Sequence, residues 1–138
     1  MSNELLAKNF TATGAIGACL IVKANANGTI SVAAAPTDPL LGVNAQVALN
    51  DGDRGDVIMS GIADVLYGAT IAAGQLLTVN ASGQAVPATR HTHTENTAAS
   101  YTQNATTGPA SPGMVIGVAL VGGVAGDIGQ VLIAPGYV

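Results

Sequence analysis

Short apolar runs separated by turn-forming residues recur along the chain, and the clearest example lies between residues 68 and 86. The run at residues 75–80 is followed by a glycine-containing turn at residues 81–83 and by a second run that starts at Gln84. Runs rich in Val, Leu and Thr on either side of such a turn favour antiparallel pairing over a helix. We therefore predict a β-hairpin here, and residues 17–32, with a slightly longer Asn/Gly turn, predict a second one.

The similarity between the two parts of the chain continues beyond these hairpins. Residues 52–59 read GDRGDVIM and residues 126–133 read GDIGQVLI, and a Gly-Val pair precedes each segment. Self-similarity on this scale indicates repeated structural units, but two copies are too few for a solenoid. The sequence thus predicts an all-β fold, with a single domain at residues 14–138 whose two repeats, residues 14–61 and 68–136, share one core.

The first repeat shows the expected strands most clearly. Its apolar runs predict strands at residues 18–24, 29–34, 41–49 and 56–59. Cys19 falls in the first of these, where a lone cysteine is most simply a small buried hydrophobe. Two prolines at residues 35–39 predict an extended connector that crosses the surface, because proline has no amide hydrogen to donate to a ladder.

Residues 1–13 precede the first repeat and form a separate N-terminal arm. Residues 4–8 are compatible with a turn of helix, whereas residues 9–13 have an extended pattern and include Phe10, the only phenylalanine of the chain. Terminal segments are ordered only when something holds them. Two interpretations stay open: an end that frays or packs on its own domain, and an arm that adds a strand to the sheet edge of a partner.

The second repeat contains a long polar insertion at residues 89–112. It has no Val, Ile, Leu, Met or Phe, so it has no apolar face to bury and favours an exposed loop. His91 and His93 alternate within it, and alternate residues of an extended segment point the same way. Three copies around a three-fold axis would bring six imidazole nitrogens to one metal ion. The other interpretation is a solvated polar loop.

Composition changes the picture in one respect, because only 9% of the residues are charged and 49% are hydrophobic. Globular proteins usually have about 25% charged residues. A surface so poor in charge predicts that partners cover part of it.

With four Lys and Arg, a net charge of -4 and 3% aromatic residues, direct binding of nucleic acid is not expected. No membrane partner is expected either, since the apolar run at residues 114–126 is interrupted by glycines.

The sequence does not contain the motifs of common catalytic sites. It lacks a nucleophile elbow and a phosphate-binding loop, and its two histidines lie in the polar insertion. We therefore expect no catalytic residues, no enzymatic activity and no bound cofactor.

Several short motifs resemble those of capsid cement, or head-decoration, proteins of tailed bacteriophages. The similarity covers roughly residues 14–136. The motifs, in order, are GIADV at 61–65, GQLLT at 74–78, GQAVPA at 83–88, IGVA at 116–119, GD at 126–127 and VLI at 131–133. They are short and consist of common residues.

This resemblance implies a small β-barrel-like domain of the β-tulip type that sits as a homotrimer on the outer surface of the expanded head. It implies that the N-terminal arm pairs with the major capsid protein, and the candidate capsid-binding residues are Leu5, Leu6, Asn9, Phe10 and Thr11. The protein would then be a virion component that stabilises the head against the pressure of packaged DNA. The alternative function is a non-enzymatic adhesion or small-ligand-binding module that uses the loop at residues 89–112.

Overall fold

The computed structural model describes residues 3–88 and 113–137, and these residues form strands and turns without a helix. The strands are β1 (Asn3–Thr11), β2 (Ile21–Ala24), β3 (Ile30–Val32), β4 (Leu40–Asn44), β5 (Arg54–Leu66), β6 (Leu76–Val79), β7 (Ala85–Pro87), β8 (Met114–Ala119) and β9 (Ile128–Tyr137).

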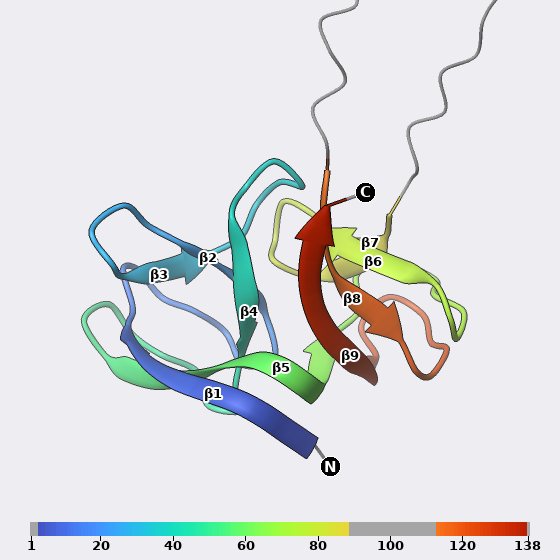
Figure 1. Ribbon diagram of the computed structural model, residues 1–138, viewed down its shortest axis with the longest axis horizontal. Helices are drawn as coiled ribbons and strands as arrows, with labels where there is room; N and C mark the ends of the chain where they lie inside the picture. The colour runs from blue at the N-terminus through green and yellow to red at the C-terminus, as the bar shows by residue number, and fades with distance from the viewer. Residues whose placement is uncertain (1–2, 89–112, 138) are drawn as a thin grey trace, which may run out of the picture.

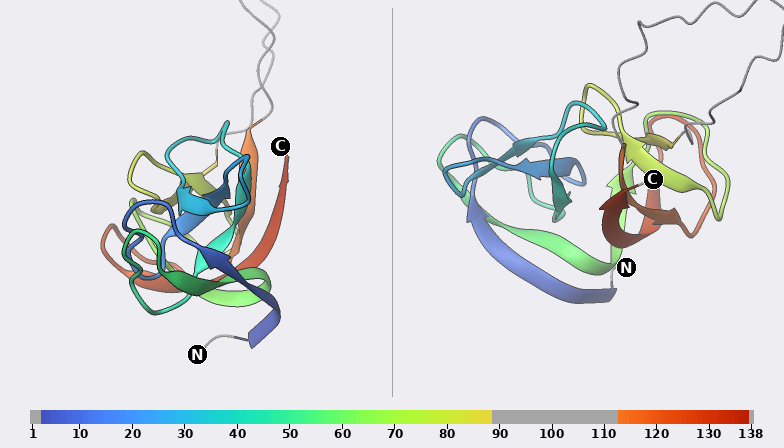
Figure 2. Two further views of the ribbon diagram at one scale, coloured as in Figure 1. Left: turned by 90° about the vertical axis from the view of Figure 1, so that its left-hand side faces the viewer. Right: turned by 45° about the horizontal axis from the view of Figure 1, so that its top comes forward.

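All strands of the described chain belong to one antiparallel sheet that curls around its own core (Figures 1 and 2). The strand order is β3-β2-β4-β5-β9-β8-β6-β7, and β1 pairs with β5 beside this path. The curled sheet forms a half-barrel, so the prediction of a small all-β, barrel-like domain is confirmed.

The long strand β5 connects two halves of the molecule. Its first part pairs with β1 and β4, and its second part, from Gly61 onward, pairs with β9. We call residues 3–60 the first half and residues 61–88 with 113–137 the second half. Figure 1 shows the first half on the left, the second half on the right and β5 passing between them.

The two halves have the same strand order and the same backbone hydrogen bonds at corresponding positions. The order β3-β2-β4-β5 in the first half matches β7-β6-β8-β9 in the second. The bond from Ala12 N to Asp53 O corresponds to that from Tyr67 N to Asp127 O. The bond from Thr13 N to Ile30 O corresponds to that from Gly68 N to Ala85 O. The bond from Ile16 N to Leu49 O corresponds to that from Ile71 N to Gly123 O. We propose on this basis that the two halves are structural repeats.

This correspondence includes β1, which the sequence pattern places outside the repeats. Phe10 lies opposite Gly55 in the pairing of β1 with β5, just as Val65 lies opposite Gly129 in the pairing of β5 with β9. In the first half, β1 therefore occupies the position that the second part of β5 occupies in the second half.

Both predicted hairpins are present, with shorter strands than the pattern suggests. β6 pairs with β7 across the turn at residues 81–83, and β2 pairs with β3. The expected strand start at residue 18 is wrong, because residues 18 and 19 form a turn and the Cys19 carbonyl accepts a hydrogen bond from the Leu66 amide instead. The expected strand at residues 41–49 ends at Asn44, whose side chain donates to the carbonyls of Gly17 and Val47.

The connector at residues 35–39 lies on the surface as expected, but the prediction that it is extended is wrong, because these residues make a compact turn. The Asp38 amide donates to the Ala35 carbonyl, and the Asp38 carboxylate accepts hydrogen bonds from the amides of Ala34 and Ala35. An aspartate that accepts from nearby backbone amides stabilises a turn, and here this local effect outweighs the extending tendency of the two prolines.

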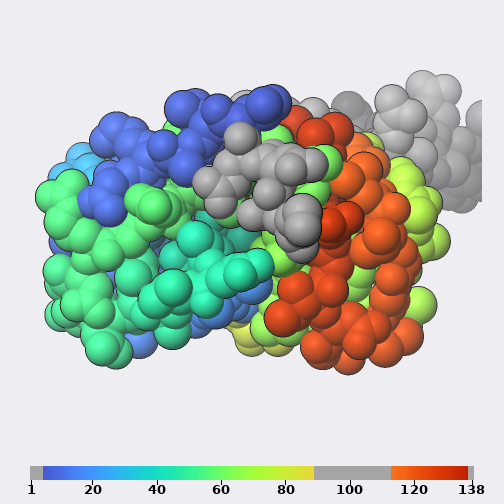
Figure 3. Space-filling model, turned by 90° about the horizontal axis from the view of Figure 1, so that it is seen from below, coloured from blue at the N-terminus to red at the C-terminus, as the bar shows by residue number. Residues whose placement is uncertain are grey.

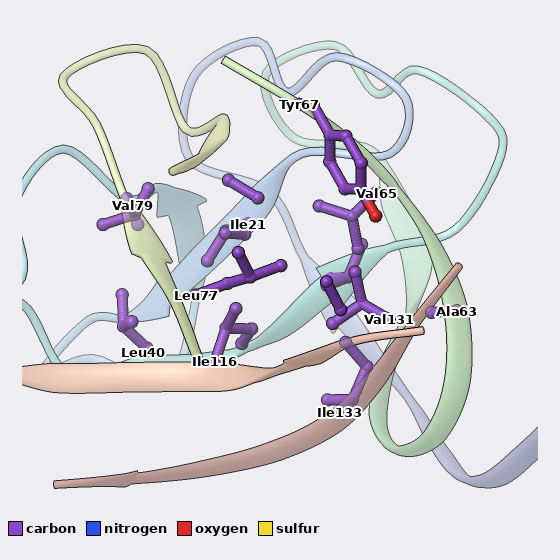
Figure 4. Close-up of a cluster of buried hydrophobic side chains, with 14 of the residues drawn as sticks. Ile21, Leu40, Ala63, Val65, Tyr67, Leu77, Val79, Ile116, Val131 and Ile133 are labelled. Atoms are coloured by element: carbon purple, nitrogen blue, oxygen red, sulfur yellow. The ribbon is translucent and has the colours of Figure 1, made fainter. Parts of the chain in front are cut away.

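The buried side chains form two clusters. The smaller one belongs to the first half and contains Ala12, Ile16, Val22, Ile30, Leu49 and Val57. The larger cluster contains residues of both halves and joins them across the centre of the molecule, as Figure 4 shows for ten labelled side chains. Tyr67 is its largest member, and its buried hydroxyl donates to the Val121 carbonyl at 2.8 Å.

Candidate functional site

Large apolar side chains are exposed mainly in the second half and on β1. On β1 they are Leu5 and Leu6, and the segment after β4 contributes Val47. The second half contributes the remaining ones, which are Leu76, Leu120, Val121, Val124, Ile128 and Leu132. Figure 3 shows the face of the molecule that carries β1 together with parts of the second half, coloured orange and red. Exposed large apolar side chains of this kind are candidates for contacts with other proteins.

The N-terminal arm is a strand from Asn3 to Thr11, followed by an isolated bridge at Ala12. The helical turn expected at residues 4–8 is wrong, because β1 pairs with β5 in antiparallel fashion from Asn3 to Thr11, with register shifts on both sides of Leu6. An isolated helical turn is unstable in water, whereas the edge of β5 offers backbone partners at every second residue. In this structure the arm packs on its own domain.

The five candidate capsid-binding residues separate into two groups. Leu5 is 81% exposed and Leu6 is 52% exposed, so both present apolar surface to solvent. Phe10 packs against the first-half cluster and Thr11 pairs with Arg54. Among the five, Asn9 is also exposed, and Leu5 and Leu6 are the two that present apolar surface without any change of fold.

Asn9 belongs to a small polar group at the end of β1. Its side-chain oxygen accepts a hydrogen bond from Arg54 Nε, and its Nδ2 donates to the Asp56 carboxylate at 3.4 Å. Beside this group the Lys8 ammonium lies 4.6 Å from the centroid of the Phe10 ring. A cation above an aromatic face is attracted to it. The two hydrogen bonds of Asn9 hold the end of β1 against β5, whereas the contact of Lys8 with Phe10 lies within β1.

The exposed leucines and valines of the second half did not emerge from the sequence as candidates. Leu120, Val121 and Val124 follow β8, and Ile128 begins β9. The sequence shows them as an apolar run, and such a run more often belongs to a core. Only the folded structure shows which members of the run face solvent, because Leu120, Val121 and Val124 lie in the connection between β8 and β9.

Buried titratable groups occur at Cys19 and Tyr67. Burial raises the pKa of the Cys19 thiol, with a smaller contribution from the negative charge of Asp64, and burial also raises the pKa of the Tyr67 hydroxyl. The prediction that Cys19 is buried is confirmed, since it is 4% exposed. A thiol with a raised pKa is a poor nucleophile at neutral pH.

His91 and His93, and the whole insertion at residues 89–112, lie outside the described residues. Within residues 3–88 and 113–137 no group of three or more His, Cys, Asp or Glu side chains is placed to hold a metal ion. The same ranges contain no helix long and apolar enough to span a membrane.

Comparisons with known proteins identify the fold. No protein-family model matches the chain, and no curated protein matches its sequence. Among solved structures, the chain is similar to the crystal structure of the head fiber gp8.5 N base in bacteriophage phi29, with a TM-score of 0.59 and 22% sequence identity. The match covers 94% of this chain and 93% of that one, so the likeness extends over the whole fold.

Proposed function

We propose that the protein is a structural, non-enzymatic component of a tailed-phage head, which binds the outer surface of the expanded shell as a decoration protein. It would attach to the major capsid protein, assemble as a homotrimer and stabilise the head against internal pressure. The observation that carries this proposal is the match of nearly the whole chain to the base of a phage head fiber. The cement-like motifs in the sequence of the second half also support it.

The surface properties of the molecule fit such a role. A decoration protein needs apolar contact area and backbone hydrogen bonds and no reactive groups. The chain has 9% charged residues, and its β1 strand lies beside β5 with two exposed leucines near its beginning. We propose that Leu5 and Leu6 contact the capsid, and that the outer edge of β1 pairs with a strand of the capsid protein.

Co-sedimentation with expanded, undecorated heads of the parent phage tests this proposal. The unaltered protein should bind saturably and make the heads more resistant to heat. A variant with Leu5→Asp and Leu6→Asp should bind at least tenfold more weakly, because two charges would have to be buried in an apolar contact. Deleting the arm is a less clean test, since Phe10 belongs to the packing of the first half.

Val47→Asp is the matched control for this experiment. Val47 is 70% exposed and lies after β4, so its substitution adds a charge elsewhere on the surface. The control should bind like the unaltered protein. A well-folded unaltered protein that does not bind heads would contradict the proposed function, and equal binding of the leucine variant would contradict the role of β1.

A further inference from the structure

One cross-strand row of apolar residues packs the first half onto the second. We call Ile21 of β2, Val43 of β4 and Ile58 of β5 row one. Ile21 lies opposite Val43, and Val43 lies opposite Ile58. All three are buried and belong to the larger cluster that joins the halves. Row one is therefore the surface through which the first half contacts the second.

The same row exists in the second half, but there it is exposed. We call Leu76 of β6, Val118 of β8 and Leu132 of β9 row two; Leu76 lies opposite Val118, and Val118 lies opposite Leu132. Leu76 is 44% exposed, Leu132 is 41% exposed and Val118 is half-buried. Row two has the same apolar character as row one, and no part of the described chain buries it.

The surface of the second half on which row one packs also has a counterpart in the first half. In the second half, Val65, Ile116 and Ile133 are at most 1% exposed and share the larger cluster with row one. The corresponding residues of the first half are Phe10, Leu41 and Met59, which we call the receiving face. They pack against the first-half cluster but are only partly buried. Each half thus has one surface of each kind, and the chain uses only one complementary pair.

The backbone around the two rows also corresponds. In row one, the Ile21 amide donates to the Gly83 carbonyl at 2.8 Å, and the Ile21 carbonyl accepts from Ala33. In row two, the Leu76 carbonyl accepts from Ala88, so the Leu76 backbone is oriented like that of Ile21. Gly28 of the first hairpin corresponds to Gly83 of the second. The Gly28 amide donates to the Asn25 carbonyl, and the Gly83 amide donates to the Asn80 carbonyl.

We infer that copies of this chain assemble head to tail, with row two of one copy packed on the receiving face of the next and the Leu76 amide donating to the Gly28 carbonyl of that neighbour. The partner is a second copy of this chain, because each copy carries both row two and the receiving face. The corresponding surfaces, row one and the face of the second half on which it packs, already bind each other within each chain. Contacts that use different surfaces on the two partners form closed rings or filaments.

A closed ring accounts for both uncovered surfaces, because no copy then keeps an unpaired row two or receiving face. If the ring contains three copies, it contains six similar halves in sequence around its axis. The number three rests on the proposed function, but the interface does not depend on it. β1 is part of the receiving half, so each copy also places its own β1 beside the junction with its neighbour.

Directional cross-linking tests this interface. We would mix protein carrying Leu76→Cys with protein carrying Ala26→Cys and add a short bis-maleimide linker. Ala26 is exposed beside Gly28, and the native Cys19 is buried. The mixture should give a Leu76–Ala26 link between chains. Leu76→Cys alone should give none, because a head-to-tail contact does not bring two copies of row two together.

Ala81→Cys is the matched control, because Ala81 is the exposed counterpart of Ala26 in the second hairpin. The hairpin at Ala81 already faces row one of its own chain, so Leu76→Cys mixed with Ala81→Cys should stay unlinked. A link between two Leu76→Cys chains, or no Leu76–Ala26 link either in concentrated solution or on heads, would overturn the inference.

A second variant checks the energetics without a linker. Leu76→Asp with Leu132→Asp should lower the mass of the assembled protein to that of a single chain in light scattering, while its circular dichroism stays unchanged, since both side chains are already exposed in the single chain. Val121→Asp with Val124→Asp, which are 40% and 54% exposed outside row two, should leave the assembly intact. Assembly that survives the row-two substitutions overturns the inference.

These outcomes can be separated from the outcome of the capsid experiment. A directional link in a protein that does not bind heads would support the interface and contradict the decoration role. Binding to heads without that link, in solution or on the heads, would support the decoration role and overturn the interface.

Discussion

Cys19 shows how a single residue departs from its surroundings. It has φ +62 in the turn before β2, a left-handed conformation that costs an L-residue with a side chain roughly 1–2 kcal/mol. Gly74 precedes β6 in the same way, and it has φ +89. The second half thus has glycine where the backbone needs this conformation, and the first half has a buried thiol.

We predict that Cys19→Gly changes the free energy of unfolding by less than about 1 kcal/mol. The relief of the left-handed strain offsets the loss of the buried sulfur and the greater flexibility of glycine in the unfolded chain. Cys19→Val should lower the free energy of unfolding by about 2 kcal/mol or more, because a β-branched residue is strongly disfavoured at positive φ. Urea unfolding measures both, and a valine variant as stable as the unaltered protein would contradict the argument.

Tyr67 gives the protein a dependence on alkaline pH. Burial raises the pKa of its hydroxyl, so the folded state holds the proton at pH values where the unfolded chain releases it. The contribution to stability is complete below the ordinary tyrosine pKa of about 10 and is lost as the pH rises through the higher pKa of the folded protein. Cys19 acts in the same direction from about pH 9.

The free energy of unfolding should therefore fall between pH 9 and pH 11, and Tyr67→Phe should reduce the slope of this fall. The same variant should cost about 1–2 kcal/mol at pH 7, because it leaves the Val121 carbonyl without its hydroxyl donor. Urea unfolding at a series of pH values measures both effects. An unchanged slope in the phenylalanine variant would show that Tyr67 is not the group responsible.

At the scale of elements, β1 is both a structural strand and a candidate binding strand. Its C-terminal part is held by the packing of Phe10 and by the contacts of Asn9, whereas its N-terminal part presents Leu5 and Leu6. The two parts should respond differently to truncation of a side chain.

We predict that Phe10→Ala lowers the free energy of unfolding by about 2 kcal/mol, which is less than for a fully buried phenylalanine because the ring is only partly buried. Leu5→Ala is the internal control and should change the free energy of unfolding by less than about 0.5 kcal/mol, because Leu5 is 81% exposed. Thermal or urea unfolding compares them. Equal effects of the two variants would mean that β1 does not pack as described.

β5 is the element that turns two similar halves into one molecule. It completes the first half beside β4 and opens the second half beside β9. One continuous strand, β5, belongs to both halves. Its pairing with β4 and with β9 therefore fixes the position of one half relative to the other. Row one and its receiving surface are thereby brought together within the chain.

At the scale of the whole molecule, low charge and exposed apolar surface point to assembly through contacts that do not depend on ion pairs. Only 12 of the 138 residues carry a formal charge, four of them basic and eight acidic. The protein therefore exerts little long-range electrostatic attraction on a partner. Salt screens such attraction strongly but leaves apolar burial largely unaffected.

We predict that the affinity for expanded heads changes by less than about tenfold between 50 mM and 500 mM sodium chloride. Co-sedimentation at a series of salt concentrations measures it, with the same heads and protein throughout. A loss of affinity much larger than tenfold would indicate that the few charged residues, such as Lys8 and Arg54 near β1, provide the main attraction.

Local sequence pattern and composition were enough to predict the all-β class and the two hairpins, and they also showed the recurrence of one pattern in two parts of the chain and the shortage of charge. These properties follow from local alternation, turn-forming glycines and composition, which act through neighbouring residues. The turn at residues 35–39 is also local, since the Asp38 carboxylate accepts from the amides of Ala34 and Ala35, but the two prolines favoured the wrong interpretation. The conformation of Cys19 was not predictable in this way, because its carbonyl accepts from the distant Leu66 amide.

Which of the two similar apolar rows is buried depends on tertiary packing and not on the sequence pattern. Ile21, Val43 and Ile58 are no more apolar than Leu76, Val118 and Leu132, so hydropathy does not distinguish the rows. Burial depends on what packs against a surface, and β5 brings a complementary surface to the first row alone. It also provides the edge along which β1 lies as a strand.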